Sequence, residues 1–168
     1  MSTIAATKDL AGIQGTWAVD PVHSEVSFEL VHAGVDTFRG SFREFTATLA
    51  DGVLEGSARV SSVDVKDEQL DGPLQSPDFF DAARYPEIAF GDGELTMKGV
   101  TRPIELDVTV NGPTTDPFGR ERLGIVAEAT IDRREFGISW NAPNQSGGDY
   151  LGNDVTLIAR LALVKQEA

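Results

Sequence analysis

The stretch from residue 20 to residue 42 reads DPVHSEVSFELVHAGVDTFRGSF and carries the clearest strand pattern of the chain. Its apolar residues Val26, Phe28 and Leu30 occupy alternate positions, with polar residues between them. Successive side chains of a β-strand point to opposite faces of the sheet. The stretch therefore predicts a strand with one buried face, and it also contains both histidines of the chain.

The two histidines fall on opposite faces of this predicted strand. His32 has the parity of the apolar positions, which predicts a hydrogen-bonded histidine turned towards the interior, near any cavity there. His23 has the opposite parity and stands with Asp20 and Ser24 near the start of the strand, where we expect structural hydrogen bonding. Because the pair is split between two faces and lacks HExxH-like spacing, no metal site is predicted.

Alternation with period two recurs along the rest of the chain, and turn signals such as Asp51-Gly52 and Asn111-Gly112-Pro113 separate the runs. Each run is typical of a strand that buries one face. The pattern predicts about eight strands, over residues 17–27, 42–50, 53–65, 87–91, 94–100, 103–111, 122–132 and 154–165.

Residues 67–85 interrupt this pattern, because their prolines and helix-start residues suit short helical turns rather than a strand. Many short antiparallel strands with one helical excursion indicate an all-β fold, either a closed barrel or a sandwich. A barrel of about eight strands can just hold a small ligand. Periodicity does not distinguish a hollow interior from one filled by side chains.

Length and composition indicate one domain, since the chain has 168 residues and is 40% hydrophobic. Residues 1–15 are small and polar and predict a flexible leader, which leaves residues 16–168 as the domain. The leader has neither a basic segment nor an apolar stretch of signal-peptide length. We therefore expect a cytoplasmic protein, and a periplasmic or secreted one only if a leader was removed.

The charge balance bears on partners, because the formal net charge is -13 and the isoelectric point is about 4.4. Phosphate backbones require a basic surface, so a nucleic-acid partner is not expected. Binding to an anionic membrane surface is not expected for the same reason. The chain has no cysteine, which excludes disulfides and thiolate chemistry.

Motifs for catalysis and for cofactor binding are weak. Ser24 follows His23 directly, so the two side chains point to opposite faces, and no GxSxG elbow is present. The glycines of GDGELT, residues 91–96, suit a hairpin and lack the third glycine of a dinucleotide-binding loop. No catalytic residue and no cofactor are predicted from these patterns.

Four blocks of sequence resemble, in the same order, those of the YceI-like, polyisoprenoid-binding family of bacterial lipocalin-like barrels. The resemblance extends over residues 17–164. The blocks are WAVDPVHSEVSF with the following HAGV and FRGSF (residues 17–42), SPDFFDAARYPEIAF (76–90), ELTMKGVTRPIELDV (94–108), and RREFG with GNDVTL (133–157).

The resemblance implies an eight-stranded, extended antiparallel barrel with a long apolar cavity. Family members hold an amphipathic lipid there, such as a polyisoprenoid, an isoprenoid quinone or a fatty-acid derivative, and some form homodimers.

The sequence departs from the family pattern at two places. Pro73 occupies the place of a family histidine in the helical segment, and only GDGE, residues 91–94, joins two strands that are usually farther apart.

The expected function is therefore non-catalytic binding, transport or storage of such a lipid. One alternative is an enzyme that acts on a small apolar substrate with His32 as acid or base, and another is a packed barrel that serves as a stress-associated interaction module. The inward-facing positions give the candidate cavity lining: Val26, Phe28, Leu30, His32, Phe42, Phe45, Ile88, Phe90, Ile104, Leu106, Val108, Phe136, Ile138 and Trp140.

Overall fold

The computed structural model describes residues 10–167 and shows a mostly β protein with one antiparallel sheet of 12 strands. One α-helix, α2 (Glu68–Leu74), and three short 3-10 helices, η1 (Pro21–His23), η2 (Val60–Ser62) and η3 (Arg133–Phe136), complete the described elements. The strands are β1 (Thr16–Val19), β2 (Glu25–His32), β3 (Asp36–Phe42), β4 (Phe45–Ala50), β5 (Val53–Arg59), β6 (Val63–Asp64), β7 (Glu87–Gly91), β8 (Glu94–Met97), β9 (Val100–Pro103), β10 (Asp107–Thr115), β11 (Glu121–Asp132) and β12 (Asp154–Lys165).

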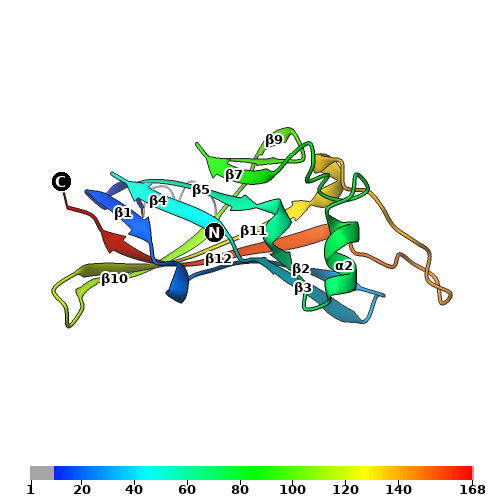
Figure 1. Ribbon diagram of the computed structural model, residues 1–168, viewed down its shortest axis with the longest axis horizontal. Helices are drawn as coiled ribbons and strands as arrows, with labels where there is room; N and C mark the ends of the chain where they lie inside the picture. Colours follow the sequence, from blue (N-terminus) through cyan, green and yellow to red (C-terminus); the bar gives the residue numbers. More distant parts are fainter. Residues whose placement is uncertain (1–9, 168) are drawn as a thin grey trace.

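Strand β12 organises the sheet. One edge of β12 pairs with β11 along its whole length, and the other edge pairs first with β2 and then with β1. Beyond β2 the sheet continues through β3 and β6. Beyond β1 it continues through β4, β5, β7, β8 and β9. In Figure 1, β10 and the C-terminus lie at one end of the long axis, and α2 with the β2–β3 hairpin lies at the other.

The strands differ in number and in closure from the eight-stranded barrel expected from the sequence. Two expected strands are broken, because η1 divides residues 17–27 and η2 divides residues 53–65. Strand β3 was missing from the expected set, and it forms a hairpin with β2 through a left-handed turn at Ala33 and Gly34. Within residues 10–167 the pairings follow an open path, and none of them closes this path into a ring.

The interior contains two apolar clusters, one towards each end of the molecule. Phe28, Phe42 and Phe136 belong to the cluster at the α2 end. Trp17 and Leu163 belong to the cluster at the β10 end, which also buries Leu10. A flexible leader was expected over residues 1–15, and residues 1–9 of it lie outside the described part of the chain. Leu10, the first described residue, is buried against the sheet.

The helical excursion expected at residues 67–85 contains α2 and a series of turns. Asp67 caps α2, because its carboxylate accepts a hydrogen bond of 3.0 Å from the backbone N–H of Gln69. Along residues 10–167, no helix combines the length and the apolar character needed to cross a membrane.

Candidate functional site

An apolar cavity of about 540 Å³ lies inside the sheet at the α2 end. Its walls come from β2, β3, β4, β5, β7, β8, β11 and β12. Helix α2, residues 76–80, the connection between β9 and β10, and the segment that includes η3 and leads to β12 contribute the rest of the lining. The volume falls within the range of about 300–1,000 Å³ that is typical of small-molecule pockets. The lining is dominated by aliphatic and aromatic side chains, so the site is suited to an apolar chain or ring rather than to a polar substrate.

The structure brings most of the sequence-predicted lining residues to this cavity, because alternate positions of each strand face the same side. Three predicted residues lie elsewhere. Val108 is buried in the cluster at the β10 end, Phe136 is only 1% exposed within the packed core, and Phe45 packs against that core. The residues at the cavity are Val26, Phe28, Leu30, His32, Phe42, Ile88, Phe90, Ile104, Leu106, Ile138 and Trp140.

Several lining residues escaped the sequence reasoning because they lie on the helix and on irregular segments. Leu70 and Leu74 reach the cavity from α2, and Tyr150 and Leu151 reach it from the segment between η3 and β12. Pro73, the departure noted in the helical segment, also borders the cavity. Periodicity of two carries no information about such segments.

Small residues on the inward face of β11 help to keep the cavity open. Ala127 and Ala129 line it and are buried, whereas Ile125 and Ile131 flank them at the same parity. Ala159 lines the cavity from the neighbouring β12 and pairs with Ala127. The sequence reasoning made no use of these small inward residues and left open whether the interior is hollow or filled.

His32 is held at the cavity by two side chains. Its Nδ1 atom lies 2.7 Å from Asp36 Oδ1, and its Nε2 atom lies 2.9 Å from the hydroxyl of Tyr150. The rings of His32 and Tyr150 are 4.8 Å apart in an edge-to-face arrangement. Both ring nitrogens of His32 therefore have partners within the protein, while the Tyr150 hydroxyl keeps capacity for a further hydrogen bond.

Arg133 is the one buried cation that borders the cavity within residues 10–167. It is 4% exposed, and it donates hydrogen bonds of 2.9 Å from Nε to the backbone oxygen of Gly152 and from Nη1 to that of Ile138. Its Nη2 group is buried without a hydrogen-bond partner. Burial lowers the pKa of this guanidinium from its usual value.

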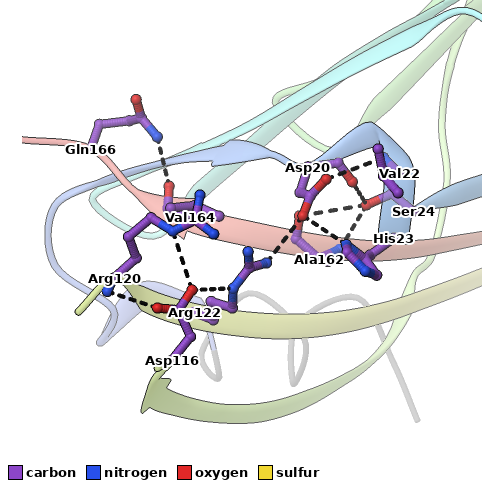
Figure 2. Close-up of polar contacts among 10 residues, drawn as sticks. All are labelled: Asp20, Val22, His23, Ser24, Asp116, Arg120, Arg122, Ala162, Val164 and Gln166. Atoms are coloured by element: carbon purple, nitrogen blue, oxygen red, sulfur yellow. Dashed lines mark hydrogen bonds and ion pairs between the residues drawn. The ribbon is translucent and has the colours of Figure 1, made fainter. Parts of the chain in front are cut away.

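The expected structural motif at Asp20, His23 and Ser24 lies away from the cavity lining. The Asp20 carboxylate caps η1, because it accepts a hydrogen bond from the backbone N–H of Val22. The same carboxylate lies 2.9 Å from His23 Nδ1. The Ser24 hydroxyl donates to the backbone oxygen of Asp20 at 2.7 Å and accepts from the N–H of Ala162 at 2.8 Å, as Figure 2 shows. These contacts fix the bend between β1 and β2 against β12.

Arg122 connects this bend to the β10–β11 hairpin. It donates from Nη1 to Asp20 at 3.1 Å and from Nε to Asp116 at 2.8 Å (Figure 2). The hydrogen bonds from His23 and then from Arg122 lower the pKa of Asp20 to about 2. The hydrogen bond from Arg122 is also the largest cause of the lowered pKa of Asp116.

Metal binding has no visible basis in the described part of the chain. Across residues 10–167, no group of three or more histidine, aspartate or glutamate side chains is arranged to hold a metal ion.

This geometry defines the class of protein: a mostly β protein with one antiparallel sheet whose strands line an apolar cavity. Comparison with known families is more specific, because a model of the YceI-like domain matches residues 17–163. The chain therefore belongs to the YceI-like domain family.

Relatives and solved structures agree with this assignment. A UPF0312 protein of Staphylococcus aureus strain USA300 is 33% identical over 153 residues, covering 81% of this chain and 90% of the relative. A polyisoprenoid binding domain from Saccharophagus degradans, implicated in plant cell wall breakdown, superposes with a TM-score of 0.70 at 12% identity, covering 89% and 98% of the two chains. BcnA of Burkholderia cenocepacia superposes with a TM-score of 0.66 at 22% identity, covering 86% and 98%. At these identities the superpositions establish a shared fold.

Proposed function

We propose that this protein binds an amphipathic lipid of isoprenoid type and carries or stores it without chemical change. The ligand class comprises polyisoprenoids, isoprenoid quinones and fatty-acid derivatives. The observation that carries the proposal is the apolar cavity of about 540 Å³, whose lining is almost entirely aliphatic and aromatic. The solved polyisoprenoid binding domain of Saccharophagus degradans, which shares the fold, supports the same ligand class.

We also propose that the sheet encloses the tail as a barrel. Strand β9 pairs with β8, and β10 pairs with β11, while residues 104–106 join β9 to β10 directly. Ile104 and Leu106 of this connection line the cavity. The chain itself therefore continues the wall between the two halves of the sheet.

Burial of the tail supplies the driving force. Each buried methylene contributes about 0.8 kcal/mol, so a five-carbon isoprene unit contributes about 3–4 kcal/mol before the costs of association. A tail of a few units therefore binds even after translational and conformational freedom are lost. Because burial of apolar surface is not directional, discrimination between tails of similar length is expected to be weak.

The two alternatives have less support. A catalytic His32 requires a ring nitrogen that faces the substrate, and both of its nitrogens contact Asp36 or Tyr150. A packed interaction module requires a filled interior, and the cavity argues against it.

Native mass spectrometry of the protein purified from its own host tests the proposal. The expected result is an added mass that corresponds to one lipid per chain and that is released by organic solvent. Delipidated protein should take up a farnesyl or geranylgeranyl compound at one equivalent. Failure to recover a lipid, together with failure of delipidated protein to take one up, would contradict the proposal.

A further inference from the structure

Arg133 carries a buried positive charge with unused hydrogen-bonding capacity beside the cavity. A guanidinium has five N–H donors. One donor of Nε and one of Nη1 are used, by the backbone oxygens of Gly152 and Ile138, and both donors of Nη2 have no partner. A buried donor without an acceptor is unfavourable, because it has lost its hydrogen bonds to water without replacement. Nη2 has almost no accessible surface in this structure, so an acceptor in the cavity gains this hydrogen bond once it displaces the groups that cover Nη2.

No carboxylate of residues 10–167 forms an ion pair with Arg133 within 4.0 Å, whereas most other arginines of this acidic chain have such a partner. The negative charges of Asp132 and Asp149 favour the charged form of Arg133, but neither carboxylate makes a hydrogen bond to its guanidinium. A buried charge without a counter-ion is unfavourable. Asp132 and Asp149 therefore offset the charge of Arg133 only at longer range, and no carboxylate of residues 10–167 contacts its guanidinium.

The other ionisable residues of the lining do not compete for this role. Glu55 and Asp78 are exposed to solvent, and His32 is occupied by Asp36 and Tyr150. The remaining residues that line the cavity are uncharged. In such surroundings a charge-assisted hydrogen bond from a guanidinium to an oxyanion is about twice as strong as a neutral one.

We propose that Arg133 makes the cavity selective for an amphiphile whose head group is an oxyanion, either a carboxylate or a phosphate, and that the guanidinium is the counter-ion of this head group. The inference rests on the proposed function and narrows its ligand class. Arg133 also ties Ile138 to Gly152, the two ends of the segment that carries Trp140 and Tyr150 to the cavity. The head group is thereby placed beneath this segment, with the tail directed along the apolar strands.

Ligands with one tail and different head groups test the proposal on the delipidated wild-type protein. Farnesoic acid, its methyl ester, farnesol and farnesyl phosphate are compared by displacement of a fluorescent apolar probe. The acid and the phosphate are expected to bind about tenfold or more tightly than the ester and the alcohol. Equal affinities for all four would overturn the inference and leave the proposed function standing, whereas no binding of any of them would remove both.

Inorganic phosphate separates the head group from a free anion. It is expected not to displace the probe, because it has no tail to bury. If it displaces the probe as well as farnesyl phosphate does, the site is one for a free anion, and the amphiphile proposal is wrong.

Variants assign the preference to Arg133. Arg133→Met is expected to bring the acid and the ester to within about twofold of one another. Arg160→Met, the same substitution on the exposed face of β12 beside Glu25, is the control and should keep the wild-type preference. Arg133→Met with an unchanged preference for the acid would contradict the proposal.

Arg133→Met also removes the hydrogen bonds to two backbone oxygens and is expected to weaken the fold, so the last test uses the wild-type protein. Farnesoic acid labelled with ¹³C at the carboxyl group is titrated in the complex by NMR. A guanidinium neighbour lowers the pKa of the bound carboxyl group relative to the same acid in buffer, while an apolar cavity without a cation raises it. A raised pKa would overturn the proposal.

Discussion

The Nε2 atom of His32 lies 2.9 Å from the hydroxyl oxygen of Tyr150, although 118 positions separate the two residues in the chain. This contact joins the end of β2 to the segment before β12, where His32 also forms an isolated bridge with Leu151. Both side chains line the cavity. This side-chain contact adds to two backbone hydrogen bonds between the same segments, from the N–H of Ala33 to the oxygen of Tyr150 at 2.6 Å and from the N–H of Gly152 to the oxygen of Val31 at 2.8 Å.

Replacement of Tyr150 by Phe tests this contact. The ring stays and the hydroxyl is lost, so stability should fall by about 1 kcal/mol or less. The segment should open more often, and a bound farnesyl ligand should leave up to about fivefold faster. Stopped-flow displacement measures the rate. Tyr85→Phe, away from the cavity lining, is the control, and an off-rate equal to that of the control would show that the contact does not retain the ligand.

Filling the cavity from β11 should abolish binding. Ala129 lines the cavity and is 6% exposed, so the ring of Ala129→Phe has no place except the space proposed for the tail. The affinity for farnesyl compounds should fall by about tenfold or more. The free energy of unfolding should fall by at most about 3 kcal/mol, because the cavity has room for the ring. Thr130→Phe adds the same ring to the exposed face of the same strand and should bind like the wild type. Binding by Ala129→Phe at wild-type affinity would place the ligand elsewhere.

Gly40 is the position in β3 where the fold has no room for a side chain. A Cβ atom there would meet the ring of Phe28 and would lie 2.9 Å from Cγ1 of Val65. Gly40→Ala should therefore lower the free energy of unfolding in urea by about 1–3 kcal/mol. Gly72→Ala in α2 is the control, because nothing lies within 4 Å of its Cβ and alanine favours a helix. Equal stability of the two variants would mean that Phe28 does not pack against β3 in this way.

Acid should weaken the link between η1 and the β10–β11 hairpin. The pKa of Asp20 falls from its ordinary 3.8 to about 2 in the folded protein. A carboxyl group with a depressed pKa stabilises the fold above its unfolded pKa, and this stabilisation disappears as pH falls from about 4 to about 2. Asp20→Asn can still cap η1 but has no charge. The stability difference between the two proteins in urea should therefore shrink over this window, and a difference that stays constant would contradict the ion pair with Arg122.

The sequence was informative where a strand has one face inside the protein. The alternation of β2 predicted both the strand and its inward side chains at the cavity, because the side-chain period of a strand is fixed by its geometry. The alternation of β11 and β12 predicted the strands, but their cavity residues, such as Ala127, Ala129 and Leu157, were absent from the predicted lining. Strand β3 was not predicted, because Gly40 interrupts the apolar residues on the inward face of DTFRGSF. Gly40 lies under the ring of Phe28.

The rest of the site depended on contacts between distant segments. Nothing in the order of residues 141–152 predicts that Tyr150 and Leu151 reach the cavity, because the segment has no regular period. Arg133 is one of 14 basic residues in an acidic chain, and composition alone assigns such a residue to the surface. Its burial follows from the two backbone oxygens that it binds.

Intermolecular NOEs between a ¹³C-labelled farnesyl tail and the methyl groups of the protein test the central claim most directly. The account predicts NOEs to Ala127, Ala129 and Leu157, which face the cavity from β11 and β12. NOEs confined to the exposed methyl groups of Val22 and Val35, with none to these cavity methyl groups, would contradict it.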